Sequence, residues 1–379
     1  MSKNGIVSCV NELGFPFKTL DPFLFCVYHK DAYPAGNTKM QAPRKGNGAD
    51  FNPHSAYRMY HGEKIPGFPQ HPHRGFETVT ATLNGIIDHA DSMGYGGRYG
   101  EGDLQWMTAG AGVVHSEMFP LIHTDKPNPL RFFQIWLNLP AKDKMVEPAF
   151  EMHWSETIPK VVSSDKKSEI VVWAGNYESA CGQRPPPNSY ASQPQNDVAI
   201  FFITLQPGGE LTLPSAEGGS STNRVVYFVE GEQLGINGDC YTNNCALTLK
   251  ADQAATFSNP TSTSVTELLI LQGKPIGEPV VKHGPFVMNT QKEIEKTFHD
   301  YRKTKFGGWP WTEDDHVFPR DETRFALQKG EYTYPPGGNP NNAKEKESCE
   351  VAEAFKNIKI EENYCNSNKH KGAVTEDSP

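Results

Sequence analysis

Two pairs of side chains that can bind a metal ion constrain the fold more than any other feature of this sequence. His71 and His73 flank a proline, and His115 and Glu117 flank a serine. Because successive side chains of a β-strand point to opposite faces, both members of each pair project to one side of their strand. If the two strands are neighbours in a barrel, three imidazoles and one carboxylate can meet at roughly 2.0–2.2 Å from a single divalent ion. The sequence therefore predicts a metal site inside a small β-barrel.

The second pair makes this prediction specific. With 13 histidines in 379 residues, a shuffled chain would contain roughly 0.4 His-x-His patterns by chance, so the first pair alone is weak support. Glu77 shares the strand parity of the first pair, and strand geometry alone leaves Glu77 and Glu117 as rival carboxylates. The histidines without a partner at ligand spacing are expected to be structural or solvated, namely His54, His61, His89, His123 and His153. Of these, His54 and His61 lie in a long loop and have the alternative of approaching the mouth of the site.

Short strand-forming runs separated by turn residues indicate mostly β structure. The 34 Gly and 30 Pro fit many turns better than a helical bundle. In the first half, strands are expected at 78–83, 86–89, 103–107 and 130–137. The first two flank Asn84-Gly85, which predicts a hairpin with a tight type I′ turn. A second β-rich block has expected strands at 169–173, 198–205, 224–229, 246–249 and 266–271. Two barrels of similar size fit this pattern.

The expected domain organisation follows from these blocks and from the polar segments between them. A capping box at Thr290–Glu293 predicts a short helix, and Ile294, Phe298 and Tyr301 give that helix one apolar face. The expected ranges are a metal-binding barrel over 1–145 with a long loop at 30–66, a linker over 146–168, a second barrel over 169–290, a helix and extension over 291–337, and a polar, disordered tail over 338–379.

Charge and hydropathy narrow the classes of function. A net charge of -9 and a pI near 5.8 give no field that would attract nucleic acid or an anionic membrane surface. No run of 18 or more apolar residues occurs, and the N-terminus does not resemble a secretory signal. Seven scattered cysteines lack the pairing of a disulfide framework. We expect a monomer located in the cytoplasm, the nucleus or both, without direct nucleic-acid or membrane binding.

Long motifs in the chain resemble the pirin family, whose members are bicupins of the cupin superfamily. The motifs are LDPFL (20–24), HPHRGFETVTATLNG (71–85), GDLQWMTAGAGVVHSEM (102–118), KMVEP (144–148) and EPVVKHGPFVMNT (278–290). FGGWPW (306–311) is similar to the C-terminal extension of many bacterial-type pirins. The resemblance covers about residues 18–328.

This resemblance implies two tandem jelly-roll cupin barrels and a metal in the first one only. In pirins the two histidines of HPH and the His and Glu of HSE hold the metal, which implies His71, His73, His115 and Glu117 as ligands and favours Glu117 over Glu77. The metal is usually Fe(II), with Mn, Ni, Cu, Co and Zn as alternatives. The second block contains no His-x-His pair, and 206–219 offers no ligand histidine, so that cupin is expected to be metal-free, as in pirins.

The resemblance also implies two functions of different classes. Some pirins resemble quercetinases, which cleave a flavonol ring with O₂, and this is the first hypothesis, with Glu117 as the catalytic base. Candidate apolar walls for the flat aromatic substrate are Phe68, Trp106, Met107 and Phe133. Other pirins are nuclear, iron-dependent co-regulators that bind a transcription factor without turnover, which is the alternative. A third possibility is that the metal only stabilises the barrel.

Four departures from the family lie around the expected entrance of the first barrel. The loop at 30–66 is longer than in pirins, and FCVYH at 25–29 stands where pirins tend to have an acidic residue. Ala111 replaces a common Arg, and Gln70 replaces a common Asp. None of them is an expected ligand, so they bear on substrate and partner more than on the metal.

Overall fold

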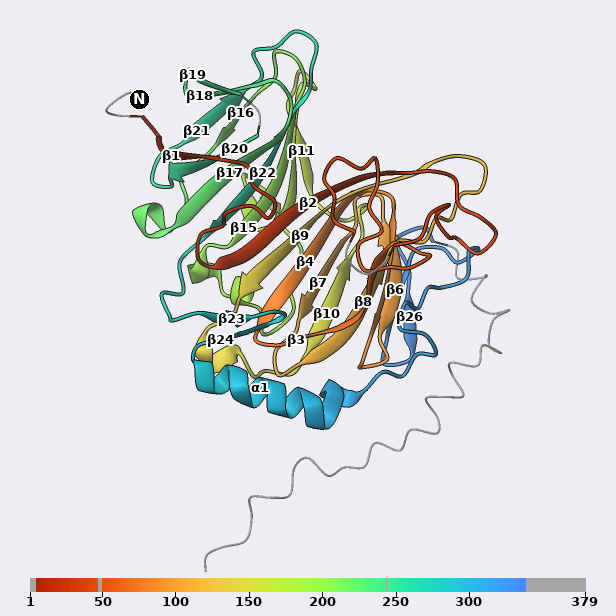
Figure 1. Ribbon diagram of the computed structural model, residues 1–379. Coiled ribbons are helices and arrows are strands. Elements are labelled where there is room, and N and C mark those ends of the chain that lie inside the picture. The colour runs from red at the N-terminus through yellow and green to blue at the C-terminus, as the bar shows by residue number, and fades with distance from the viewer. Residues whose placement is uncertain (1–4, 47–49, 243, 339–379) are drawn as a thin grey trace, which may run out of the picture. The chain divides into compact units, whose positions relative to one another are not determined.

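The regular structure of the protein consists almost entirely of strands. A computed structural model describes residues 5–46, 50–242 and 244–338 (Figure 1). Its α-helix is α1 (Gln291–Thr304), and single 3₁₀ turns lie at Ala141–Asp143, Tyr190–Ser192, Pro194–Asn196, Gly219–Ser221 and Lys305–Gly307. The all-β prediction with a short C-terminal helix is confirmed. The tail expected at 338–379 lies outside the described residues except for Gly338.

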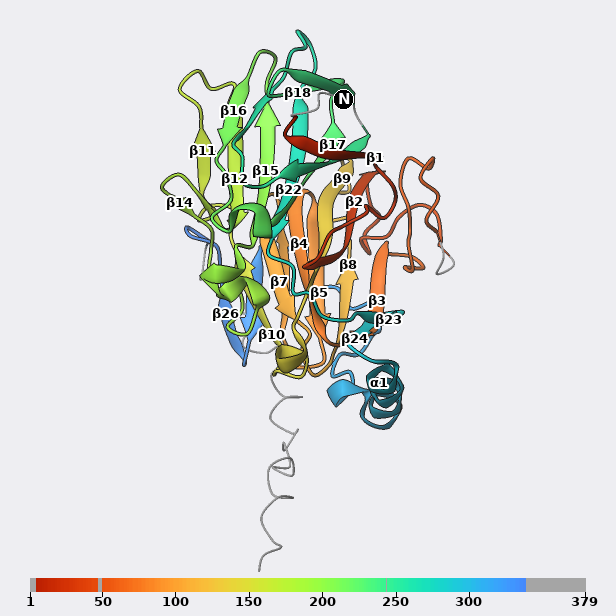
Figure 2. The same ribbon diagram turned by 90° about the vertical axis from the view of Figure 1, so that its left-hand side faces the viewer.

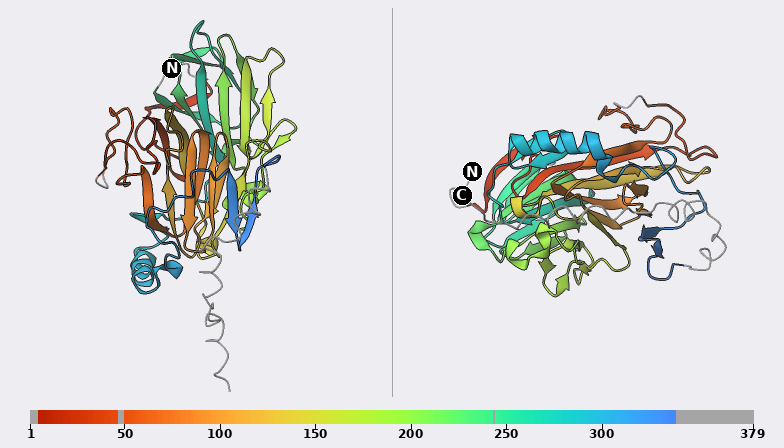
Figure 3. Two further views of the ribbon diagram at one scale, coloured as in Figure 1. Left: turned by 90° about the vertical axis from the view of Figure 1, so that its right-hand side faces the viewer. Right: turned by 90° about the horizontal axis from the view of Figure 1, so that it is seen from below.

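The first barrel consists of two antiparallel sheets (Figures 1, 2 and 3). One sheet has the order β10 (Ala149–His153), β7 (Leu104–Thr108), β4 (Phe76–Asn84), β9 (Asn128–Asn138) and β2 (Phe23–Tyr33). The other has the order β26 (Glu331–Thr333), β25 (Phe325–Gln328), β6 (Gly96–Gly100), β5 (Ile86–Asp91), β8 (Val113–Met118) and β3 (Gly67–His73).

The second barrel is built in the same way. Its larger sheet has the order β1 (Val7–Glu12), β20 (Cys245–Lys250), β17 (Asn223–Glu230), β22 (Thr266–Gly273), β15 (Ala199–Leu205), β12 (Ser168–Ala174) and β11 (Lys160–Val162). Its smaller sheet has the order β16 (Glu210–Leu213), β21 (Ala255–Ser258), β18 (Gln233–Ile236) and β19 (Asp239–Thr242). Two short pairs complete the set, β13 (Asn176–Tyr177) with β14 (Ala180–Cys181) and β23 (Val281–His283) with β24 (Phe286–Met288).

The apolar core lies in three layers, one inside each barrel and one between the barrels. In the middle layer Val79, Trp106 and Phe133 of the five-stranded sheet meet Trp173 and Phe202 of the seven-stranded sheet. The rings of Phe133 and Trp173 are 6.1 Å apart between centroids. Each such side chain contributes roughly 1.5–3 kcal/mol by leaving water, so this layer holds the two barrels together. The five-stranded sheet is therefore buried on both faces.

The hairpin predicted at Asn84-Gly85 is wrong, although both of its strands exist. β4 pairs with β7 and β9, whereas β5 pairs with β6 and β8. Gly85 has a φ of +84°, and a Cβ there would lie 2.6 Å from the carbonyl oxygen of Pro129. Gly85 thus has the positive φ of a turn residue and lies close to the backbone of Pro129. At this point, however, the chain passes from one sheet to the other instead of forming a hairpin.

Strand pairing also crosses the expected domain ranges in three places. β10 and β11 both fall within the expected linker 146–168, where β10 pairs with β7 and β11 with β12. β1 belongs to a sheet of the second barrel, since it pairs with β20. β2 continues to Tyr33, so the irregular part of the expected loop 30–66 begins at residue 34. The 146–168 segment is thus not a free linker. The expected ranges stay predictions where they mark the limits of the domains.

Helix α1 begins where the sequence predicts. Thr290 accepts a hydrogen bond from the Glu293 backbone N–H, and the Glu293 carboxylate accepts one from the Thr290 N–H, which completes the capping box. The predicted apolar face packs on β24, with Ile294 buried and Phe298 against Phe286 at 5.1 Å between ring centroids. None of the described helices is long and apolar enough to cross a membrane.

Arg74 ties this helix to the first barrel, directly after the predicted ligand His73. Its Nη1 donates to the Asp300 carboxylate at 2.9 Å, and its Nε donates to the Ala111 carbonyl oxygen at 2.6 Å. The guanidinium lies over the Phe306 ring, 4.4 Å from the centroid. Arg74 therefore links the end of β3, the turn before β8 and helix α1.

Replacing Arg74 by Ala should lower the free energy of unfolding by about 2–3 kcal/mol, because the buried guanidinium contacts are lost and the part-buried Ala111 carbonyl oxygen and Asp300 carboxylate each lose a donor. The matched control is Lys296→Ala, which removes the exposed partner of the same Asp300 carboxylate and should cost less than about 0.5 kcal/mol. Urea unfolding measures both variants. Equal small losses would contradict the role of Arg74 as a buried tie.

Candidate metal centre

The predicted ligand strands are neighbours. β3 pairs with β8 in antiparallel register, with His71 opposite His115. Directly opposed residues in a ladder point to the same face, so His71, His73, His115 and Glu117 all face the interior of the first barrel. The register of β3 and β8 thus places both predicted ligand pairs on one face, as a shared metal site requires.

The three imidazoles form one compact group. Each can offer a nitrogen such that all three lie within 4.8 Å of one another, and among the described residues this is the one group of three or more candidate ligands. The ring centroids of His71 and His115 are 4.5 Å apart, and those of His73 and His115 are 4.9 Å apart. The arrangement is that of a divalent metal site.

The hydrogen bonds around these rings fit metal ligation. The Nδ1 of His71 donates to the Pro69 carbonyl oxygen at 2.9 Å, and that of His73 donates to the Pro285 carbonyl oxygen at 3.3 Å. Both rings therefore keep Nε2 unprotonated, as ligating histidines do when a carbonyl oxygen holds the other nitrogen. Both nitrogens of His115 are buried without a partner among the described residues. A buried imidazole without a partner is costly, and a cation satisfies it.

Burial keeps the three histidines neutral. Desolvation lowers the pKa of His71 to about 4, and it lowers the pKa values of His73 and His115 well below the ordinary value. Their mutual proximity adds to the effect. Neutral imidazole is the form that binds a metal, so the site needs no proton loss from its histidines at physiological pH.

Glu117 faces the same cavity but is held by the opposite wall. Gln134 Nε2 lies 2.6 Å from Glu117 Oε2, and Thr80 Oγ1 lies 2.8 Å from Glu117 Oε1 and 2.7 Å from Gln134 Oε1. The Thr80 hydroxyl has one proton but two oxygen neighbours, so the second hydrogen bond needs a proton from the Glu117 carboxyl. Exchanging the oxygen and nitrogen of the Gln134 amide again leaves one hydrogen bond that needs a proton on Glu117. Burial raises the pKa of Glu117, which agrees with a protonated carboxyl.

The rival carboxylate, Glu77, lies on the other face of the five-stranded sheet. Its oxygens accept hydrogen bonds from Thr108 Oγ1 at 2.7 Å and from Ser189 Oγ at 2.8 Å. This places Glu77 between the barrels rather than beside the histidine group. Desolvation outweighs these hydrogen bonds and raises the pKa of Glu77 to about 7.

His89 and His61, which sequence reasoning set aside, both belong to this neighbourhood, and His61 lies in the lining of the cavity described below. His89 on β5 is the register partner of Glu117, and its ring centroid lies 5.5 Å from that of His115. Its Nε2 lies 3.2 Å from Asp91 Oδ2, and its Nδ1 is buried without a partner among the described residues. In the sequence, the one sign was that His89 and Asp91, two residues apart, point to the same face of their strand. Only the pairing of β5 with β8 shows that this face is the one that carries His115 and Glu117.

A cavity of about 840 Å³ is lined by His71 and His73 of the histidine group. Its lining is mostly aromatic and aliphatic, with a few polar groups. The lining residues are Phe15, Pro16, Phe25, Val27, His29, Phe51, His61, Phe68, Pro69, Gln70, His71, His73, Glu117, Phe132, Gln134, Trp136 and Pro285. Such a cavity can enclose a flat aromatic molecule close to the three imidazoles.

Of the four predicted walls, only Phe68 lines this cavity. Trp106 and Phe133 pack in the layer between the two barrels, and Met107 packs inside the first barrel. These three assignments are wrong: Trp106 and Phe133 project from the outer face of a sheet that the second barrel covers, and Met107 lies on the inner face but outside the cavity lining. Apolar character could not distinguish the two faces, since both are buried.

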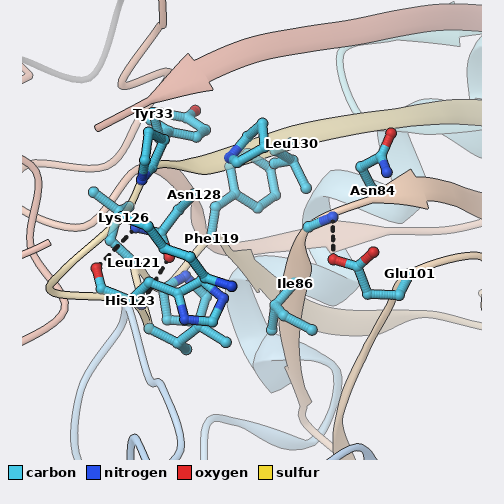
Figure 4. A pocket seen from close by; sticks show the side chains of 15 residues that line it. Tyr33, Asn84, Ile86, Glu101, Phe119, Leu121, His123, Lys126, Asn128 and Leu130 are labelled. Carbon is cyan, nitrogen blue, oxygen red and sulfur yellow. Dashed lines mark hydrogen bonds between the residues drawn. The ribbon is translucent and has the colours of Figure 1, made fainter. Parts of the chain in front are cut away.

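A second cavity of about 430 Å³ lies where β4 passes into β5 (Figure 4). Polar side chains that line it form hydrogen bonds within the protein. Glu101 Oε1 accepts from the Gly85 N–H at 2.9 Å, and Asn128 Nδ2 donates to the His123 carbonyl oxygen at 3.0 Å. Among the described residues no group of three candidate metal ligands lies there, so the larger cavity is the candidate site.

Comparison with known proteins follows the same division into two barrels. A profile of the Pirin family matches residues 16–137, and a profile of the pirin C-terminal cupin domain matches residues 200–307. A pirin-like protein of Solanum lycopersicum is 39% identical over 246 residues, which are 64% of this chain and 77% of that protein. This chain belongs to the pirin family. Pirin-1 of Arabidopsis thaliana is likewise 39% identical over 250 residues, 64% of this chain and 78% of that protein.

The fold agrees with that of a solved bicupin. The crystal structure of a quercetin 2,3-dioxygenase from Acinetobacter baumannii superposes with a TM-score of 0.64 at 25% sequence identity, covering 80% of this pirin and 98% of that chain. The expectation of two tandem cupin barrels is confirmed. The expectation that the second cupin holds no metal stays a prediction.

Replacing Glu77 by Gln should make stability less sensitive to pH. The folded-state pKa of Glu77, about 7, lies above the ordinary 4.5, so its stabilising contribution is complete below the lower value and is lost as the pH rises through the upper one. The stability of Glu77→Gln relative to wild type should therefore rise between pH 5 and 8 by up to about 3 kcal/mol. Urea unfolding measures it, with exposed Glu63→Gln as the control, and a constant difference would contradict the prediction.

Proposed function

We propose that this pirin is a non-haem Fe(II) enzyme that cleaves the heterocyclic ring of a flavonol with O₂, as a quercetin 2,3-dioxygenase does. One observation carries the proposal: His71 and His73, two members of the compact group of three neutral imidazoles, line a largely aromatic cavity. The likeness to the quercetin 2,3-dioxygenase of Acinetobacter baumannii supports it. The proposed ligands are His71, His73, His115 and Glu117.

The donor set fits a divalent metal of intermediate softness. Imidazole with a carboxylate suits Fe(II), and Mn, Ni, Cu, Co and Zn share this preference to different degrees. When bound, such a metal supplies open positions for oxygen ligands and a positive charge that lowers the pKa of a nearby carboxyl group.

Glu117 is the proposed base. Its carboxyl sits between Thr80 and Gln134 on the wall facing the histidines, within the cavity that the substrate would fill. Once ionised, its carboxylate can accept the proton of the substrate's 3-hydroxyl, and the hydrogen bond from Gln134 Nε2 fixes the carboxylate's orientation. Phe68, Phe132 and Trp136 would exclude water from the flat ring system.

The decisive test is O₂-dependent loss of quercetin absorbance with Fe(II)-loaded protein. The double variant His71→Ala, His73→Ala should abolish turnover, and Glu117→Gln should lower kcat by about 10²–10⁴-fold. His123→Ala, which changes the second cavity instead, should leave turnover unchanged. If wild type consumes no more quercetin than the double variant, the proposal fails. Metal binding without turnover would then favour the co-regulator function, or a metal that only stabilises the barrel.

Quercetin binding should distinguish Phe68, a residue of the cavity wall, from Phe133, a residue of the core. Phe68→Leu should weaken anaerobic quercetin binding by roughly 3- to 10-fold, because Phe68 lines the cavity. Phe133→Leu, fully buried between the barrels, should lower the free energy of unfolding by about 1 kcal/mol and leave binding unchanged. Fluorescence titration and urea unfolding measure the two effects. The opposite assignment would return Phe133 to the substrate site.

A further inference from the structure

His29 on β2 is a polar group of the cavity that the proposed metal chemistry does not use. Its ring stacks on Phe132, with centroids 4.4 Å apart and planes at 15°. It lines the cavity and is only 4% exposed. It also ends the FCVYH segment, one of the places where this chain departs from other pirins.

A buried chain of hydrogen bonds determines which nitrogen of His29 carries the proton. Tyr60 Oη lies 2.7 Å from Asp31 Oδ2 and 2.7 Å from His29 Nδ1. Arg58 donates to both oxygens of Asp31, through Nε at 2.9 Å and Nη2 at 3.2 Å, so Asp31 is a carboxylate. The single Tyr60 proton must then go to Asp31. His29 Nδ1–H donates to Tyr60, and Nε2 remains an acceptor.

The irregular segment between β2 and β3, called the insertion from here on, supplies half of this chain of hydrogen bonds. His29 and Asp31 belong to β2, whereas Arg58 and Tyr60 belong to the irregular segment after it. Tyr60 is 0% exposed and Arg58 is 6% exposed, so this part of the insertion is a fixed wall of the barrel. The Arg58 backbone N–H also donates to Asp31 Oδ1 at 2.8 Å, which locks the two segments together.

His29 stays neutral in this setting. Desolvation, with the nearby Arg58 charge, lowers the pKa of His29 to about 3. At physiological pH the ring therefore offers an uncharged acceptor and no positive charge. The described residues provide no hydrogen-bond donor to Nε2, so a ligand hydroxyl can satisfy it.

The other polar groups of the cavity have protein partners or lie at its mouth. Gln134 donates to Glu117, and Gln70 Nε2 donates to Asp314 at 2.7 Å. His61 is exposed at the rim. His29 is thus the buried acceptor within an otherwise aromatic wall.

We propose that His29 Nε2 accepts a hydrogen bond from a ring hydroxyl of the aromatic substrate, and that it selects flavonols with hydroxyls beyond the 3-position. The inference rests on the proposed function, since it names a determinant of specificity in the same cavity. An ether or carbonyl oxygen at that point would face a lone pair and be rejected.

Anaerobic equilibrium binding to the Fe(II)-loaded protein tests this without turnover. The probes are quercetin and 3-hydroxyflavone, which retains the 3-hydroxyl and lacks the other ring hydroxyls. His29→Phe keeps a flat ring on Phe132 and removes the acceptor. It should weaken quercetin binding by about 3- to 10-fold and change 3-hydroxyflavone binding less than about twofold. Tyr60→Phe removes the hydroxyl that fixes the His29 tautomer, while Arg58 still pairs with Asp31. It should lower the preference for quercetin over 3-hydroxyflavone, and it replaces His29→Phe as the test if that variant does not fold.

The outcomes separate this inference from the proposed function. Selective loss of quercetin affinity supports the role of His29, even if wild type fails to cleave quercetin. Equal loss of both probes, or no loss of either, overturns it, even if cleavage proceeds. A wild type that binds quercetin no better than 3-hydroxyflavone overturns it as well.

Discussion

The antiparallel pairing of β3 with β8 is the constraint on which the site depends. It sets His71 opposite His115, and each strand carries its second candidate ligand two residues away. A slip of one residue would turn every one of these side chains to the outer face. Several contacts around the pair resist such a slip, above all Arg74, which joins the end of β3 to the turn before β8 and to helix α1. Through Arg74 the helix helps to hold the two strands of the candidate metal site in register.

The double burial of the five-stranded sheet explains both the fate of the two carboxylates and the failure to predict the cavity walls. Glu77 and Thr80 lie on the same strand but face opposite layers, so Glu77 meets Ser189 between the barrels while Thr80 meets Glu117 inside one. A sheet with one solvated face would have shown its direction through alternating polarity. Here both faces are buried and both carry aromatic side chains, with Trp106 on one and Trp136 on the other, so aromatic character alone does not reveal which face a residue lies on.

What the sequence predicted well was local, and what it missed was long-range. Strand parity places the ligand pairs, and the capping box begins helix α1 at the expected residue, because both depend on neighbours in the chain. The hairpin at Asn84-Gly85 failed because turn chemistry specifies backbone angles and not the partner strand. His89 was missed for the same reason, since its closeness to His115 arises from the pairing of β5 with β8.

The insertion after β2 fixes the hydrogen-bonding character of His29 without touching the candidate metal ligands. An isolated histidine in an aromatic wall could present either a donor or an acceptor to a ligand, because its two neutral tautomers differ little in energy. Here the charge of Arg58 fixes Asp31 as an acceptor, Asp31 takes the Tyr60 proton, and Tyr60 then takes the His29 Nδ1 proton. Each step removes one alternative, so a charge on the insertion determines the hydrogen-bonding character of a group inside the cavity. A pirin that lacked this insertion would lack that control, even with the same candidate metal ligands.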